Sequence, residues 1–255
     1  MITSDDVAEL GTILGIWAHP DDEAYLSGGL MALARDNGQR VACVTATRGE
    51  RGTPDPVAWP PDRLAAERTH ELARCLEILG VREHHWLGYR DGECAGADRD
   101  AAVARLCAVL DDVRPDTVLT FGPDGITGHP DHRTVSAWAG AAVDRAASGA
   151  RLLHSAVTDQ REARWGALTD RLGVYLPGYP VLTPAERLAV GLVLPRDIAV
   201  RKVRALAAQA TQTAGLMATL GVDLYTAWVG EESFVEAARV PPVTATETLV
   251  GSPPV

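Results

Sequence analysis

Short apolar runs alternate with amphipathic helical patterns through the first 150 residues of this 255-residue chain. The predicted strands cover residues 13–17, 41–45, 85–87 and 117–121. Each is followed by a loop and then by apolar residues at helical spacing, and glycine or proline ends several of the helical segments. Strand and helix in this repeated order indicate parallel βαβ units. The alternation therefore predicts an α/β fold.

The arrangement expected from this pattern is a Rossmann-like three-layer fold around a mainly parallel sheet. No domain linker or internal repeat interrupts the sequence. We therefore predict a single domain over 1–240 with a more irregular C-terminal part, followed by a Pro-rich tail over 241–255. In the second half we expect a strand over 152–157, helices over 160–172 and 198–220, and irregular chain over 173–184.

Composition and charge exclude several classes of function. Apolar residues make up 46% of the chain, enough for a substantial core. The formal net charge of -10 argues against sequence-independent binding to nucleic acid and against a polybasic membrane-surface patch. No run approaches ~20 apolar residues, so we expect no membrane span. Four cysteines without CxxC pairing, and an N-terminus without signal-peptide features, favour the cytoplasm.

Two loops of this pattern are rich in histidine and carboxylate. The first follows the strand over 13–17 and reads Ala18-His19-Pro20-Asp21-Asp22-Glu23. The second follows the strand over 117–121 and a glycine-rich loop, and reads His129-Pro130-Asp131-His132. In an open α/β sheet, ligands bind outside the carboxyl ends of the strands, so both loops can meet in one crevice. Imidazole and carboxylate together suit a zinc-type divalent ion, which in catalytic sites has three protein ligands and one open position.

Helix capping is the alternative interpretation of each loop. Aspartate is a common N-cap, and proline is favoured at the first helical position. Capping needs one acidic residue per loop and no histidine, so it accounts neither for Asp21 with Asp22 nor for His129 with His132. A metal site accounts for both pairs, because groups that do not bind the metal are free for acid–base chemistry. We therefore favour a metal site.

With these two loops, the chain resembles the LmbE-like (PIG-L) family of zinc deacetylases. That family includes N-acetylglucosaminyl-phosphatidylinositol de-N-acetylases and the deacetylases of the bacterial mycothiol and bacillithiol pathways. Further segments resemble the family's motifs in the expected order: the loop over 47–52, Arg68-x-x-Glu71-Leu72 within a helix, and the loop over 87–92. The resemblance covers the chain up to about residue 150.

The resemblance implies a zinc-dependent enzyme that removes an acetyl group from the amide nitrogen of an N-acetylated amino-sugar or small glycoside. One zinc ion per chain would be bound by His19, Asp22 and His132. A small-molecule substrate of this kind would be the partner, and no nucleic acid is expected. The oligomeric state and the identity of the substrate are left open.

The resemblance also implies roles for residues around the metal. Asp21 would be the general base. His129, oriented by Asp131, would lie near the substrate carbonyl and stabilise the negative charge that develops on its oxygen. The residues expected to contact substrate are Arg68, Asp91 and Glu50.

Two positions depart from the family pattern. Some sugar deacetylases of the family carry a tyrosine two residues before His-Pro-Asp-His, where this chain has Thr127. In a C-terminal helix, Gln209 stands where a histidine is frequent. Two other functions stay open: a metal-dependent phosphoesterase, which would hold two metal ions, and a non-catalytic sugar- or nucleotide-binding module. No GxGxxG follows the first strand, so dinucleotide binding is poorly supported.

Overall fold

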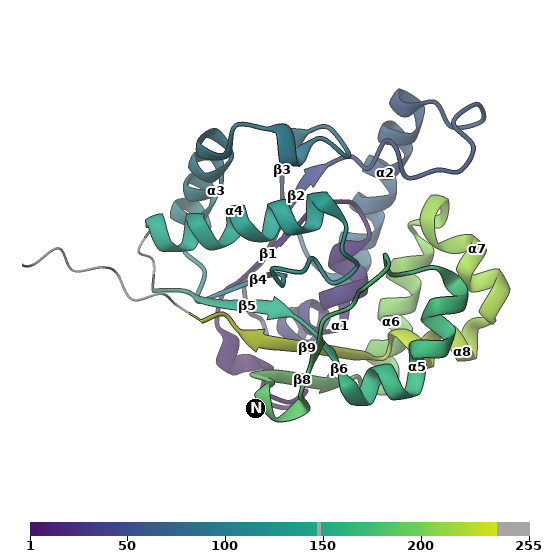
Figure 1. Cartoon of the computed structure of the whole chain (residues 1–255). Helices are drawn as coiled ribbons and strands as arrows, with labels where there is room; N and C mark the ends of the chain where they lie inside the picture. Colours follow the sequence, from purple (N-terminus) through teal and green to yellow (C-terminus); the bar gives the residue numbers. More distant parts are fainter. Residues whose placement is uncertain (147–148, 239–255) are drawn as a thin grey trace, which may run out of the picture.

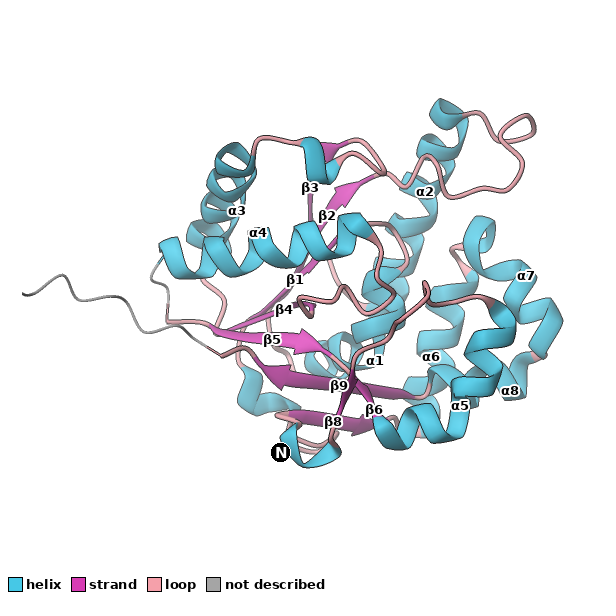
Figure 2. Cartoon of the chain, viewed as in Figure 1, coloured by secondary structure: helices cyan, strands magenta, loops and turns pink. Residues whose placement is uncertain are grey.

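A seven-stranded sheet with helices on both faces forms the centre of the molecule (Figures 1 and 2). The computed structural model describes residues 1–146 and 149–238. The strand order is β3-β2-β1-β4-β5-β9-β8, and β6 and β7 form a separate two-stranded sheet. The strands are β1 (Ile13–Trp17), β2 (Val41–Thr47), β3 (Glu83–Tyr89), β4 (Thr117–Phe121), β5 (Arg151–Ser155), β6 (Val157–Thr158), β7 (Leu182–Thr183), β8 (Val190–Val193) and β9 (Glu231–Glu236).

The first five strands of this sheet are parallel, which confirms the predicted βαβ units. β1 and β4 are buried along their whole length, because helices cover both of their faces. After β1 the chain adds β2 and β3 on one side, and then crosses to add β4 and β5 on the other. The switch in direction lies between β1 and β4, so their carboxyl ends border the crevice where such sheets bind ligands.

The helices form the two outer layers. On one face α3 packs against α4, and on the other α1 packs against α2 and α6 (Figure 1). The α-helices are α1 (Asp22–Asp36), α2 (Pro61–Leu79), α3 (Arg99–Val113), α4 (Pro130–Ala146), α5 (Asp159–Leu172), α6 (Arg196–Ala207), α7 (Ala210–Leu220) and α8 (Val222–Val229). Short 3₁₀ turns lie at Val7–Leu10, Cys94–Gly96 and Ala185–Arg187.

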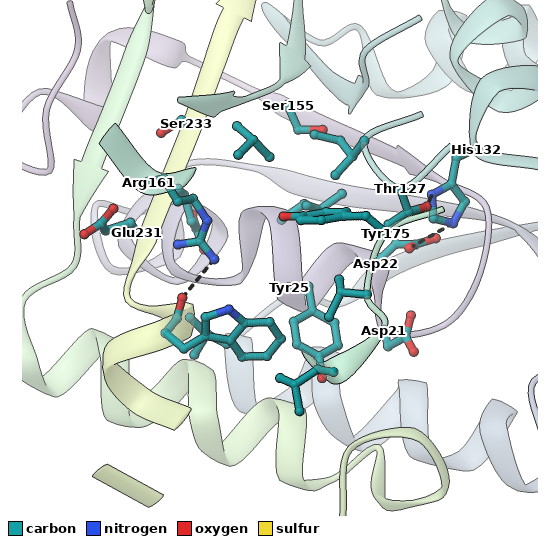
Figure 3. A pocket seen from close by; sticks show the side chains of 18 of the residues that line it. Asp21, Asp22, Tyr25, Thr127, His132, Ser155, Arg161, Tyr175, Glu231 and Ser233 are labelled. Atoms are coloured by element: carbon teal, nitrogen blue, oxygen red, sulfur yellow. Dashed lines mark hydrogen bonds and ion pairs between the residues drawn. The ribbon is translucent and has the colours of Figure 1, made fainter. Parts of the chain in front are cut away.

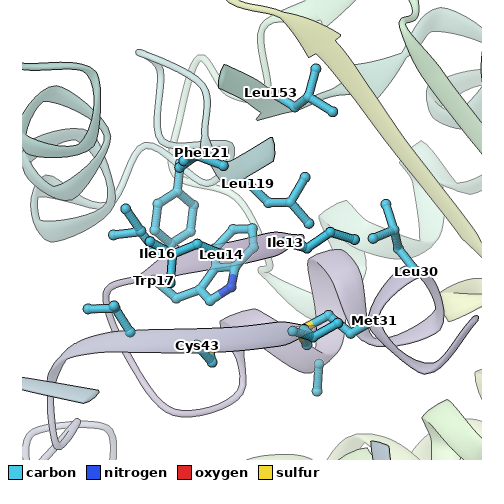
Figure 4. Close-up of a cluster of buried hydrophobic side chains, with 14 of the residues drawn as sticks. Ile13, Leu14, Ile16, Trp17, Leu30, Met31, Cys43, Leu119, Phe121 and Leu153 are labelled. Carbon is cyan, nitrogen blue, oxygen red and sulfur yellow. The ribbon is translucent and has the colours of Figure 1, made fainter. Parts of the chain in front are cut away.

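The hydrophobic core reaches up to the carboxyl ends of β1 and β4. Figure 4 shows Trp17 and Phe121 side by side, with their rings in an edge-to-face contact at 5.1 Å. The Phe121 ring also stacks on the imidazole of His132, with ring centroids 4.2 Å apart. Packing of this kind holds an imidazole in one orientation. The core therefore supports the second histidine loop directly.

The second half of the chain differs from the expectation in two places. The segment 198–220 is not one helix: α6 ends at Ala207 and α7 begins at Ala210. The antiparallel strands β8 and β9 were not predicted. β9 contains three glutamates, which disfavour strands, but Glu232 is buried because it pairs with the buried Lys202.

Four further expectations concern the segment 173–184, the cysteines, membrane-spanning helices and the C-terminal tail. The segment 173–184 is irregular apart from β7, as predicted. All four cysteines are free. In the described part of the chain, every helix is too short or too polar to cross a lipid bilayer. The predicted Pro-rich tail over 241–255 lies outside the described residues, and the domain extent of 1–240 stays a prediction.

Candidate metal centre and active site

The loop after β1 places Asp21 in a backbone conformation that side chains rarely adopt. Its φ is +108°, outside the regions allowed to most L-residues, and such a residue costs about 1–3 kcal/mol. Two interactions hold it: its N–H donates to Glu23 Oε2 at 2.9 Å, and its carbonyl accepts the N–H groups of Ala24 and Tyr25 as α1 begins. Asp21 occupies the N-cap position, yet its carboxylate makes no capping hydrogen bond. The capping interpretation of this loop is therefore wrong.

Three side chains from the two loops converge on one point. His19 Nδ1 lies 3.2 Å from His132 Nε2 and 3.6 Å from Asp22 Oδ2. His132 Nε2 lies 3.4 Å from Asp22 Oδ1. Zinc binds such ligands at about 2.0–2.2 Å, so the ligand atoms of a tetrahedral site lie roughly 3.3–3.6 Å apart. The two histidine nitrogens and the Asp22 carboxylate lie at about this spacing, with a different oxygen of Asp22 facing each histidine.

The remaining ring nitrogens of the two histidines face hydrogen-bond acceptors. His132 Nδ1 lies 3.0 Å from the carbonyl of Gly125, and His19 Nε2 lies 3.1 Å from Asp91 Oδ1 and 3.3 Å from Asp131 Oδ2. A proton on each of these nitrogens leaves a lone pair on His132 Nε2 and on His19 Nδ1, where the donors converge. This is the arrangement that orients metal-binding histidines in proteins.

The carboxylates of Asp91 and Asp131 both lie against His19. The Asp131 carboxylate accepts the N–H groups of Gly92 and Cys94 and lies against His19, whereas only the Asp131 backbone N–H reaches His129, at Nδ1. Both residues are buried, and the expected roles of Asp91 in substrate contact and of Asp131 in orienting His129 stay predictions. These two residues can orient His19. The sequence could not reveal this, because the loop over 90–94 meets His19 only in the folded chain.

Burial and charge act against each other in this cluster. Burial lowers the pKa of His19, but hydrogen bonds to Asp131, Asp22 and Asp91 outweigh it and raise the pKa well above its usual value. Burial raises the pKa of Asp22, and the charges of His132 and His19 outweigh it and lower the pKa. The carboxylates around His19 therefore favour a positive charge at this position.

Asp21 lies beside the three donors and is paired with Arg68. Asp21 Oδ2 is 3.3 Å from Arg68 Nη2, and Arg68 also donates to the carbonyls of Pro20 and Gly49. Burial raises the pKa of Asp21, and the Arg68 charge acts in the opposite direction. Since Asp21 is outside the set of three donors, its carboxylate is free to exchange a proton.

Arg68 and Glu50 contact the protein in this structure. Arg68 is buried, and Glu50 Oε1 accepts the N–H of Asp91 at 3.1 Å. The loop over 47–52 makes room for the guanidinium: a Cβ atom on Gly49, whose φ is +64°, would lie 2.1 Å from Arg68 Nη1. The expected substrate contacts of these residues stay a prediction, and their observed contacts support the Asp21 loop and the Asp91 loop.

His129 is half-buried beside the other two histidines. One ligand atom from each of His19, His129 and His132 lies within 4.8 Å of the others. Burial, and then the charge of His19, lower the pKa of His129. Because His129 Nδ1 accepts the N–H of Asp131, the proton of the neutral ring is on Nε2. His129 can thus donate a hydrogen bond as a neutral imidazole, and does not need the Asp131 carboxylate to hold it protonated.

A cavity of about 370 Å³ opens beside Asp21, Asp22 and His132. Figure 3 shows these residues at one side, Tyr25 and Tyr175 across the middle, and Arg161 with Glu231 at the other side. Thr127 also lines the cavity, and its hydroxyl lies 3.2 Å from His132 Nδ1. Part of the wall away from the centre comes from α5, α7, α8 and the segment 173–175, which carry no motif. Sequence reasoning therefore missed this side of the site.

The fold and the site together define a class: an α/β protein with a mainly parallel sheet and a histidine–carboxylate centre at its topological switch point. Comparison with known proteins gives the family. The family profile described as PIG-L: GlcNAc-PI de-N-acetylase matches residues 14–143. A relative from Acidothermus cellulolyticus is 34% identical over 234 residues, covering 80% of each chain. The chain belongs to the PIG-L (LmbE-like) family.

The relatives carry the name 1D-myo-inositol 2-acetamido-2-deoxy-alpha-D-glucopyranoside deacetylase. A second one, from Kineococcus radiotolerans, is 39% identical over 148 residues, which are 47% of this chain and 41% of that protein. The match thus spans less than half the length of that relative, although it covers 80% of the Acidothermus protein.

Solved structures share the fold. The N,N'-diacetylchitobiose deacetylase of Pyrococcus horikoshii superposes with a TM-score of 0.62 at 22% identity, over 91% of this chain and 87% of that one. The zinc-inhibited form of the teicoplanin deacetylase Orf2 gives 0.65 at 16% identity, over 91% and 100%. At these identities the likeness concerns the fold, and confirms the predicted three-layer α/β arrangement.

Proposed function

We propose that this protein is a zinc-dependent N-deacetylase. Its substrate class is an N-acetylated amino-sugar or small glycoside of the kind named for its relatives, and one zinc ion per chain is held by His19, Asp22 and His132. The observation that carries the proposal is the convergence of His19 Nδ1, His132 Nε2 and the Asp22 carboxylate within 3.2–3.6 Å of one another. The buried carboxylates around His19 add charge that a divalent ion balances.

The chain's own residues complete the reaction. When bound, a zinc ion supplies Lewis-acid chemistry, polarising a carbonyl oxygen and making water more acidic. Asp21 takes a proton from the attacking water at its carboxylate, and returns it to the amine nitrogen that leaves. Arg68, paired with Asp21 Oδ2, holds that carboxylate in place.

His129 acts on the other reacting atom. Its Nε2–H donates a hydrogen bond to the carbonyl oxygen as negative charge develops there. Removal of such a donor typically costs about 10²–10³ in turnover. Thr127 contacts His132 and has no phenol that could donate to the same oxygen. The half-buried His129 is therefore the donor in this proposal.

The test is release of amine from N-acetylglucosamine glycosides, including the inositol glycoside named for the relatives. We expect turnover that a chelator abolishes and added zinc restores. Metal analysis should find close to one zinc ion per chain. A protein without divalent metal above background, or a metal-loaded protein that releases no amine from any of these compounds, would overturn the proposal.

The two alternatives are a phosphoesterase with two metal ions and a non-catalytic binding module. A second ion would need His19, Asp91 and Asp131, which also lie close together. To bind both ions, His19 would have to lose both ring protons and become an imidazolate. A neutral His19 can instead donate its Nε2–H to these carboxylates and bind one ion through Nδ1. Hydrolysis of aryl phosphates with two ions per chain would favour the phosphoesterase. The cytoplasmic location and the absence of nucleic-acid binding stay predictions.

A further inference from the structure

The cavity beside the candidate centre is much larger than an acetyl group needs. Its volume of about 370 Å³ falls in the range of small-molecule sites, about 300–1,000 Å³. An acetyl group has a single methyl beyond its carbonyl. When a substrate amide is bound at Asp21, Asp22 and His132, the cavity has room for the sugar or for a group attached to it or to the acyl carbon (Figure 3).

The middle of the cavity is apolar. Leu26, Val157, Leu172 and Leu216 line it together with the rings of Tyr25 and Tyr175. The Tyr25 hydroxyl already shares a hydrogen bond with the Tyr225 hydroxyl, at 2.8 Å. Leucine and valine side chains cannot satisfy hydroxyl groups, so this part of the cavity favours an apolar segment.

The far end carries a positive charge without a carboxylate partner among the described residues. Its two acidic residues are already paired, Glu231 with Arg164 and Glu232 with Lys202. Arg161 Nη2 donates to the carbonyl of Trp228 at 2.9 Å. Arg161 Nη1 is buried and has no hydrogen-bond partner in the part of the chain that the structure describes. Such a group is usually satisfied by water or by a ligand.

Three residues that line the cavity carry buried polar atoms without a hydrogen-bond partner among the described residues. They are Arg161 Nη1, Trp228 Nε1 and Ser155 Oγ. The guanidinium and the indole can only donate hydrogen bonds. Arginine binds carboxylates with particular strength, because two N–H groups can face two oxygens.

We propose that this cavity binds an apolar segment of the substrate that ends in a carboxylate, and that Arg161 selects for that carboxylate. The inference rests on the proposed function for the position of the reacting amide at the opposite end. The segment belongs either to the acyl group or to the group attached to the sugar, and both present the same chemistry to the cavity.

Two pairs of substrates separate these sources. In the acyl pair, N-hexanoyl-glucosamine is compared with the same compound carrying a terminal carboxylate. In the aglycone pair, the butyl glycoside of N-acetylglucosamine is compared with its 4-carboxybutyl counterpart. We expect kcat/KM to favour the carboxylate by at least tenfold in one pair. Arg161→Gln should remove that preference, and Arg161→Lys, which keeps the charge, should retain part of it.

Controls separate specificity from folding. Arg171→Gln, on the exposed side of the same helix α5, should leave the preference unchanged. Turnover of N-acetylglucosamine by Arg171→Gln should match that of the unaltered protein. A preference below twofold in both pairs, or one that survives in Arg161→Gln, would overturn the inference while the deacetylase proposal stands.

Binding gives a readout that does not need turnover. Calorimetric titration of the zinc-loaded protein with hexanoate and with hexanamide should show tighter binding of the anion, by at least tenfold, and Arg161→Gln should abolish the difference. Direct binding of carboxylate to the metal would survive in this variant and would contradict the inference. Arg161-dependent binding without any amine release would support the cavity's specificity and overturn the deacetylase proposal.

Discussion

Asp21 combines a strained backbone with a partly buried carboxylate that is not among the converging donors. Its φ of +108° turns the carboxylate away from the helix it precedes and toward Arg68. Its neighbour Asp22 lies against both histidines. Two adjacent aspartates therefore face different partners, and only Asp22 belongs to the set of converging donors.

Asp21→Asn tests this division. An amide cannot accept the water proton, so we expect turnover to fall by about 10²–10⁴ with the zinc content unchanged. The matched change, Asp22→Asn, removes a ligand charge and should lower zinc affinity. Near-normal turnover in Asp21→Asn would contradict the base assignment. Metal analysis and amine-release kinetics on the same preparations provide both measurements.

Glu23 supports the strained residue. It is fully buried, its Oε2 accepts the Asp21 N–H, and its Oε1 accepts Gln209 Nε2 at 2.6 Å. Burial raises the pKa of this carboxyl to about 7. Glu23 is therefore a positioning residue, and Gln209, at the place where the family often has histidine, orients it.

Glu23→Gln leaves one side-chain oxygen to accept two donors, the Asp21 N–H and Gln209 Nε2. We expect kcat to fall by about tenfold, with KM and zinc content near their normal values, because misplacing a reacting group by a fraction of an ångström slows the reaction. The exchange Glu23→Gln with Gln209→Glu restores one donor and one acceptor, and should recover most of the activity. Full activity of the single variant, or no recovery in the exchange, would count against positioning.

At the level of elements, a buried ion pair links three segments under the site. Lys202 of α6 and Glu232 of β9 are both completely buried, with Nζ 2.7 Å from Oε1. Glu232 also accepts the N–H groups of Gly29 and Leu30 in α1, and Lys202 donates to the carbonyl of Tyr25. The pair thus holds α1, which begins at Asp22, against the C-terminal part of the chain.

Lys202→Met should cost about 3–5 kcal/mol of unfolding free energy, because it leaves a buried carboxylate without its cation. Adding Glu232→Gln to this variant should cost less than the sum of the two single changes, since the second change removes the uncompensated charge. Urea denaturation measures each value. Strictly additive costs would show that the two groups are not coupled.

For the whole molecule, the sequence predicts the parallel half well and the antiparallel edge poorly. The strands β1 and β4 are buried on both faces, so they appear as continuous apolar runs that are easy to recognise. β9 is acidic, and only its pairing with Lys202 makes burial of Glu232 favourable. That pairing joins α6 to a distant strand, and no local pattern reveals it.

The residues of the site are likewise predictable from the sequence only in part. The donors of the centre follow two strand ends, so spacing along the chain predicts that they meet. The partners of His19, namely Asp91 and Asp131, depend on how a distant loop folds over the first one. Arg161 and Trp228 reach the cavity from helices without a motif, and only the assembled fold brings them opposite Asp22.

The position of the metal is measured most directly by anomalous diffraction from crystals of the zinc-loaded protein at the zinc absorption edge. The geometry predicts one peak per chain, bonded to His19 Nδ1, His132 Nε2 and the Asp22 carboxylate, with Asp21 beside it and not bonded. A peak between His19 Nε2, Asp91 and Asp131, or no zinc peak at either position, would contradict it.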